Sequence, residues 1–175
     1  MHYGLPGRAY RVGVAAVSPS RRLPCRPSRG AADTIGAMSS PAGVTVLVYS
    51  NSPEVRLAVR TAVGRRPAPD SPRIEWVECG TNAEVISELD AGGLDLVILD
   101  GEAQPTGGAG LARQFKYEID DCPPIVVLIA RAQDAWLASW SLADAVIAAP
   151  LDPVAAASVV AEQLRRRSAG VPVVR

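Results

Sequence analysis

The stretch LDLVILD at residues 94–100 decides how this chain folds. It is a short apolar run that ends in an acid, Asp100, which is typical of a strand buried on both faces of a parallel sheet. Gly92 and Gly93 come before it and a glycine-rich loop follows it, so turn residues bound the run on both sides. The sequence therefore predicts an internal strand whose carboxyl end carries Asp100.

Four more runs that predict strands lie outward from it, two on each side, and helical signals separate them. A helix is predicted after Ser52, which can cap its amino end, with Pro53 at its first position. Another is predicted where Thr81 and Glu84 form a capping box. The four runs are VTVLVYS at 44–50, RIEWVEC at 73–79, IVVLIA at 125–130 and ADAVIAA at 143–149.

Five strands alternating with five helices predict an α/β protein, a doubly wound parallel sheet with helices on both faces. Ligands of such sheets bind outside the carboxyl ends of the strands. The residues expected at that edge are Ser50, Asn51, Asp100 with the loop after it, Ile129, Ala130 and Ala149.

Charge divides the chain of 175 residues into two parts. Residues 1–43 are rich in Arg, Pro, Gly and Ser and lack apolar periodicity, so we interpret them as a disordered basic tail or a mis-assigned start. The rest has 12 basic and 17 acidic residues, which disfavours nucleic-acid binding because phosphate recognition needs a clustered basic face. We place the folded domain at 44–168 and a short C-terminal tail at 169–175.

The sequence also argues against export and membrane insertion. No apolar run approaches the ~20 residues that cross a bilayer, and residues 12–17 are too short for the apolar part of a signal peptide. Cys25, Cys79 and Cys122 are widely spaced and odd in number, so neither a disulfide framework nor a zinc site is indicated. We expect a cytoplasmic protein.

Residues 44–168 resemble the receiver domain of two-component response regulators. The segment VLVYSNSPEVR resembles the first strand and its acidic turn, LDLVILD the strand that ends in the phosphoacceptor aspartate, and PPIVVLIARA the fourth strand. ADAVIAAPLDP resembles the fifth strand with its proline. The resemblance implies a flavodoxin-like fold with strand order 2-1-3-4-5.

The resemblance also implies a chemistry from which this sequence departs. In the family an aspartate attacks phosphorus, a divalent cation held by two acids neutralises the phosphoryl oxygens, and a lysine and a hydroxyl stabilise the product. Asp100 matches the phosphoacceptor. The acidic pair, however, matches Ser50 and Asn51, the hydroxyl matches Ile129, and the lysine matches Ala149.

Asp100 therefore has two interpretations. It can cap the loop after its strand by accepting backbone N–H bonds, or it can retain some phosphate chemistry. We expect no metal or cofactor; a weak Mg²⁺ site, if one exists, would use Asp100, Glu102 and Asn51.

A partner surface is suggested by Trp136 and Trp140, which share one face of a predicted helix. In the family the aromatic switch position of the fifth strand matches Val146. If the tryptophans point outward they form a docking or dimer patch, and if inward they belong to the core.

The resulting hypothesis is a stand-alone atypical response regulator, a pseudo-receiver that acts by protein–protein interaction and not as an enzyme, either by docking to a partner protein or by homodimerisation. One alternative is a working phosphorelay receiver that a histidine kinase phosphorylates at Asp100. A second is a small-molecule or flavin binder on the same fold. Glycines 107, 108 and 110 lack the GxGxxG and GK[ST] spacings, which disfavours a nucleotide site in that loop.

Overall fold

The computed structural model describes residues 43–172. The interpretation of residues 1–43 as a basic tail or mis-assigned start lies outside the described residues except for Gly43, and so do the last three residues of the expected C-terminal tail.

Five parallel strands form one sheet in the order β2-β1-β3-β4-β5, which confirms the flavodoxin-like order that the receiver-domain resemblance implies. Each strand lies within two residues of its predicted bounds. The strands are β1 (Val44–Tyr49), β2 (Ile74–Cys79), β3 (Leu96–Asp100), β4 (Ile125–Ile129) and β5 (Ala145–Ala148).

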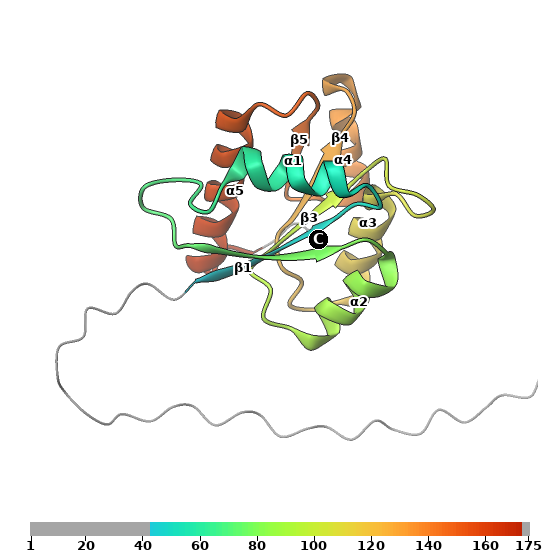
Figure 1. The fold of residues 1–175 in the computed structure, drawn as a ribbon. Coiled ribbons are helices and arrows are strands. Elements are labelled where there is room, and N and C mark those ends of the chain that lie inside the picture. The colour runs from blue at the N-terminus through green and yellow to red at the C-terminus, as the bar shows by residue number, and fades with distance from the viewer. Residues whose placement is uncertain (1–42, 173–175) are drawn as a thin grey trace, which may run out of the picture. The chain divides into compact units, whose positions relative to one another are not determined.

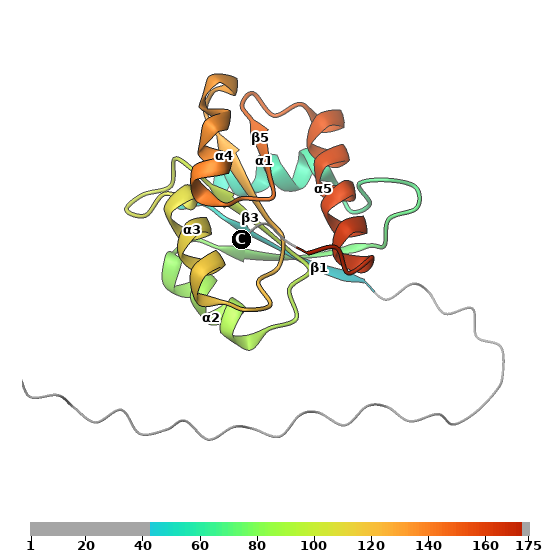
Figure 2. The ribbon, with the colours of Figure 1, turned by 180° about the vertical axis from the view of Figure 1, so that it is seen from behind.

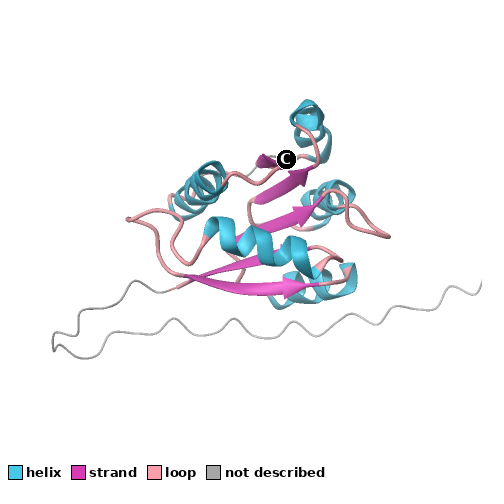
Figure 3. Cartoon of the chain, turned by 45° about the horizontal axis from the view of Figure 1, so that its top comes forward, coloured by secondary structure: helices cyan, strands magenta, loops and turns pink. Residues whose placement is uncertain are grey.

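Helices connect the strands and cover both faces of the sheet. Figure 1 shows α1 and α5 on one side and α2 and α3 on the other, and Figure 2 shows α4 beside α3 from behind. Figure 3 shows the layered arrangement, with strands between helices. The helices are α1 (Pro53–Val63), α2 (Asn82–Ala91), α3 (Gly108–Glu118), the short 3-10 helix η1 (Ala132–Ala135), α4 (Trp136–Ser141) and α5 (Pro153–Ser168).

Two apolar cores result from the alternation of side chains along the strands. In β1, Leu47 and Tyr49 enter the core under α2 and α3, whereas Val46 and Val48 enter the core under α1 and α5. Strands β3 and β4 are buried along their whole length, as expected for the centre of a parallel sheet. The next positions along β1 and β3 lie at the carboxyl edge, where the candidate site is expected.

The caps at the helix ends are those that the sequence predicts. The Ser52 hydroxyl accepts a bond from the Val55 N–H at 3.3 Å, and Thr81 and Glu84 form the predicted capping box. These contacts set where α1 and α2 begin, and so fix the lengths of the turns after β1 and β2.

A buried ion pair lies near the opposite edge of the sheet. Lys116 on α3 donates to Asp144 Oδ2 at 2.6 Å, and both side chains are almost fully buried. The same oxygen accepts the N–H of Ile125 at the start of β4, at 2.7 Å. The only lysine in the sequence therefore has a structural role. It lies near the start of β4, away from the carboxyl ends of the strands.

No helix within residues 43–172 is both long enough and apolar enough to cross a membrane.

Candidate functional site

Asp100 ends β3 and is nearly buried, at 8% exposure. Each of its carboxylate oxygens accepts a hydrogen bond from the protein. The Ser50 hydroxyl donates to Oδ2 at 2.7 Å, and the Glu102 N–H donates to Oδ1 at 3.0 Å. The second bond spans two residues and closes the turn after the strand, which is how an aspartate caps a loop.

Ser50 and Asn51, the residues at the family's acidic positions, are both engaged. Ser50 is completely buried, and its Oγ accepts the Ser52 N–H at 3.1 Å. The Asn51 Oδ1 accepts the Gln104 N–H at 2.9 Å. The turn after β1 is therefore tied to the loop after β3 by the neutral Asn51–Gln104 hydrogen bond.

Two glycines let the loop after β3 return closely to Asp100. A Cβ on Gly108 would lie 2.6 Å from the Asp100 carbonyl oxygen and 2.7 Å from the Leu99 Cβ, and one on Gly107 would lie 2.7 Å from the Gly101 carbonyl oxygen. Any other residue would need the backbone to shift there. Gly110, in contrast, has open space where its Cβ would be.

Tyr49 anchors the same loop, which reasoning from the sequence missed. Its hydroxyl donates to the Thr106 carbonyl at 2.9 Å from the end of β1. Burial, and then the nearby charge of Asp100, raise the pKa of this phenol. The sequence hinted at this role only by placing one tyrosine at the end of a strand that otherwise consists of valine, leucine and threonine.

A cavity of about 250 Å³ opens beside Asp100 at the carboxyl ends of β3, β4 and β5. Asp100 and Glu102 are its only ionisable lining residues. The others are apolar: Val55, Ala58, Leu128, Ile129, Ala130, Ile147, Ala149 and Leu151.

The residues at the family's hydroxyl and lysine positions lie at this cavity but offer no polar side chain. Ala149 is exposed at its mouth, and Ile129 is 3% exposed and joins the core under α3. Of the three residues considered for a cation, Asp100 and Glu102 line the cavity, and the oxygen of Asn51 is used by Gln104. Within residues 43–172, no three His, Cys, Asp or Glu side chains are grouped to hold a metal ion.

The tryptophans of α4 point outward. Trp136 is 62% exposed and Trp140 is 47% exposed. The guanidinium of Arg113 on α3 lies 5.3 Å from the Trp140 ring centroid and 5.4 Å from that of Tyr117, itself an exposed residue. Val146 is half-buried against the core, so it adds little to this exposed aromatic group.

Two proteins similar in sequence are response regulatory proteins of Mycobacterium tuberculosis, each named as uncharacterized, from strains CDC 1551 / Oshkosh and H37Rv. Each is 48% identical over 126 residues, which covers 72% of this chain and 95% of the relative. No family model matches the chain.

Solved structures share the fold at low sequence identity. The receiver domain of the Francisella response regulator 1452 has a TM-score of 0.59 at 14% identity, covering 70% of this chain and 98% of that chain. Response regulator TrrA of Thermotoga maritima, solved in complex with Mg²⁺ and BeF, has a TM-score of 0.56 at 22% identity, covering 69% of this chain and 98% of that chain. In the alignments with the mycobacterial relatives, by contrast, almost half of the aligned residues are identical.

Proposed function

The chain belongs to the response regulators, as its mycobacterial relatives show, and we propose that it acts in two-component signalling as a pseudo-receiver. In this proposal it acts through protein–protein interaction, not as an enzyme, with little or no Mg²⁺-dependent phosphorylation of Asp100. Its place of action is the cytoplasm.

The observation that carries the proposal is how the Asp100 carboxylate is used. Both oxygens hold protein donors, the hydroxyl of Ser50 and the N–H of Glu102. A phosphoryl-transfer site instead needs cations or donors around the incoming phosphoryl oxygens. Ala149 and Ile129 supply neither, and the walls of the cavity are otherwise apolar.

The residues present do not fit Mg²⁺. This ion favours six oxygen ligands, carboxylates and water above all. Ser50 offers a neutral hydroxyl that is already bonded, and the Asn51 oxygen is held by the loop. The proposed function therefore uses no bound cation.

We place the partner surface on α4 and the adjoining face of α3, comprising Trp136, Trp140, Tyr117 and Arg113. Aromatic residues and arginine are enriched in protein–protein interfaces, and lysine and glutamate are depleted. The exposure of both tryptophans supports docking of another protein or of a second copy of this chain.

Titration of ¹⁵N-labelled protein with beryllofluoride and Mg²⁺, followed by amide NMR, tests the loss of the switch. We expect no saturable shifts at Asp100, Glu102 or Ala149 in protein whose spectrum shows it to be folded. Saturable shifts that disappear in Asp100→Asn would show a working phosphoryl pocket and refute the proposal. The double variant Ser50→Asp/Asn51→Asp, which restores the acidic pair, serves as the comparison in which cation binding is expected to rise.

A second candidate function is that of a receiver phosphorylated by a histidine kinase. It is favoured by the position of Asp100 at the carboxyl end of β3, bordering a cavity that Glu102 also lines. Intact-mass measurement after incubation with acetyl phosphate and Mg²⁺ tests it. A phosphoryl adduct absent from Asp100→Asn would support this candidate over the pseudo-receiver.

The cavity gives no support to a flavin binder, because none of its lining residues is aromatic.

A further inference from the structure

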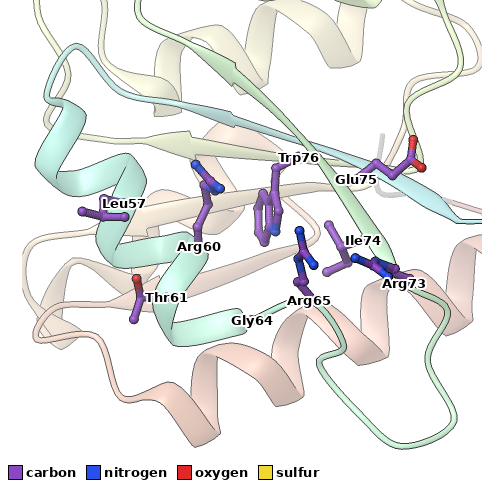
Figure 4. Close-up of a pocket in the computed structure, with 9 residues that line it drawn as sticks. All are labelled: Leu57, Arg60, Thr61, Gly64, Arg65, Arg73, Ile74, Glu75 and Trp76. Atoms are coloured by element: carbon purple, nitrogen blue, oxygen red, sulfur yellow. The ribbon is translucent and has the colours of Figure 1, made fainter.

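A cleft distinct from the Asp100 cavity lies between α1 and the edge strand β2 (Figure 4). Its volume is about 580 Å³, and it shares no lining residue with the cavity beside Asp100. This volume falls within the roughly 300–1,000 Å³ of small-molecule sites. The cleft is lined by Leu57, Arg60, Thr61, Gly64, Arg65, Arg73, Ile74, Glu75 and Trp76.

Arginines dominate the charge of this cleft. Arg60 shares the carboxylate of Glu78 with its neighbour Arg56, so one acid faces two guanidinium groups. Arg65 and Arg73 make no ion pair with any residue of the described range 43–172, and both are exposed. The cleft therefore has a local excess of positive charge, although residues 44–175 are acidic as a whole.

Glu75 is the only acid among the lining residues, and it does not neutralise the cleft. Figure 4 shows its carboxylate directed away from Trp76 and Arg65. This is the geometry expected of β2, in which Ile74 and Trp76 face α1 and the residue between them faces the other side.

The Nε of Arg60 is a buried donor without an acceptor among the described residues. Buried polar groups nearly always have a partner, and a bound ion or ligand is one explanation of an exception. Arg60 lines the cleft, but this nitrogen itself is covered by protein atoms, so Arg60 adds to the charge of the cleft and its Nε is not a donor that faces it.

Trp76 adds a flat apolar surface to the arginines. Its ring is partly buried against the core under α1, and Figure 4 shows it between the side chains of Arg60 and Arg65. Planar guanidinium groups suit phosphate, and an aromatic face suits a nucleobase.

We propose that this cleft binds a phosphate-bearing small molecule with a flat ring, of the nucleotide class. The phosphate lies against Arg60, Arg65 and Arg73, and the ring lies against Trp76. The cleft shares no lining residue with the Asp100 cavity, so ligand binding in the cleft can be tested separately from the pseudo-receiver function.

Titration of ¹⁵N-labelled protein with ADP tests the proposal, with the Trp76 indole N–H and the arginine Nε–H signals as readouts. The indole signal is assigned with Trp76→Phe, which keeps an aromatic ring in the packing. We expect saturable shifts at Trp76, Arg65 and Arg73 with ADP, shifts at the arginines alone with pyrophosphate, and much weaker shifts with adenosine.

Variants then separate a built site from general attraction of anions. Arg65→Ala/Arg73→Ala is expected to weaken ADP binding tenfold or more, whereas Arg131→Ala, which removes an exposed arginine outside the cleft, leaves it unchanged. Asp100→Asn is also expected to leave ADP binding unchanged. Arg60 is kept because its removal would also break its ion pair with Glu78.

Several outcomes overturn the proposal. One is the absence of shifts at about 5 mM ADP, well above the dissociation constant of even a weak site near ~1 mM. Another is an equal loss of binding in Arg131→Ala, which would indicate nonspecific attraction. Tighter binding of a polyglutamate peptide or a DNA oligonucleotide to these residues would overturn the ligand class.

Discussion

Ser50 Oγ donates a 2.7 Å hydrogen bond to Asp100 Oδ2, between the carboxyl ends of two adjacent strands of the sheet. The receiver-domain resemblance places an acid at position 50, which would repel Asp100 unless a cation lay between them. A hydroxyl turns this repulsion into attraction, because it offers a proton to the carboxylate. The Ser50–Asp100 bond thus joins the carboxyl ends of β1 and β3 directly.

The bonds of Asp100 predict how the site tolerates substitution. Asp100→Ala leaves the Ser50 hydroxyl and the Glu102 N–H without an acceptor and should cost about 1–3 kcal/mol of the free energy of unfolding. Asp100→Asn keeps an acceptor for Glu102 and should cost less. Urea unfolding measures both, and an equal cost would show that the negative charge, not the hydrogen bonds, is what matters.

Gly108 and Gly110, in the first turn of α3, should respond oppositely to substitution by alanine. Gly108→Ala should destabilise the protein by about 1–3 kcal/mol, because the new Cβ forces overpacking against Asp100 and Leu99. Gly110→Ala lies inside α3 with open space around it and should stabilise by about 0.5–1 kcal/mol. Thermal or urea unfolding of the two variants checks this, and a loss of stability in Gly110→Ala would contradict it.

The buried pair of Lys116 and Asp144 predicts a large effect from a single change. Lys116→Met removes the buried cation that pairs with Asp144 and should cost about 3–5 kcal/mol. The double variant Lys116→Met/Asp144→Asn should recover part of that loss, because the amide oxygen can still accept the Ile125 N–H. Arg165→Ala, which breaks exposed ion pairs to Asp70 and Glu162, is the control and should cost only about 0–1 kcal/mol.

Cys79 predicts a pH dependence at alkaline pH. Burial, assisted by Glu84 and Glu88, raises the pKa of this thiol from 9.0 to about 11. Between these values the unfolded chain releases the thiol proton while the folded chain keeps it, so the free energy of unfolding falls as pH rises. The fall should be shallower in Cys79→Ala, measured by urea unfolding at a series of pH values; identical slopes would refute this.

Trp136, one of the two exposed tryptophans of α4, is expected to contribute little to stability. Trp136→Ala should change the free energy of unfolding by no more than about 0.5 kcal/mol, as for most surface positions. Phe115→Ala, which empties a core position, should cost about 3–5 kcal/mol. If Trp136→Ala proves as destabilising as Phe115→Ala, the tryptophan is part of the packing and the partner surface must be sought elsewhere.

The sequence by itself determined the order of the elements and the class of fold. Apolar runs such as LVILD specify strands buried on both faces, and Ser52 and Thr81 specify where helices begin, as the structure confirms. These signals are local, because periodicity and caps act within a few residues. Resemblance to a known family supplied the strand order, which periodicity alone does not give.

The tertiary structure decided which distant residues share hydrogen bonds. Three side-chain hydrogen bonds join segments that lie 50 residues or more apart in the sequence. They are Ser50 to Asp100, Gln104 N–H to Asn51, and Tyr49 to the Thr106 carbonyl. The tertiary structure also decided that the tryptophans of α4 face outward and that Arg60, Arg65 and Arg73 gather around Trp76. No local pattern encodes these relationships, because they arise only when parallel strands bring their ends and faces together.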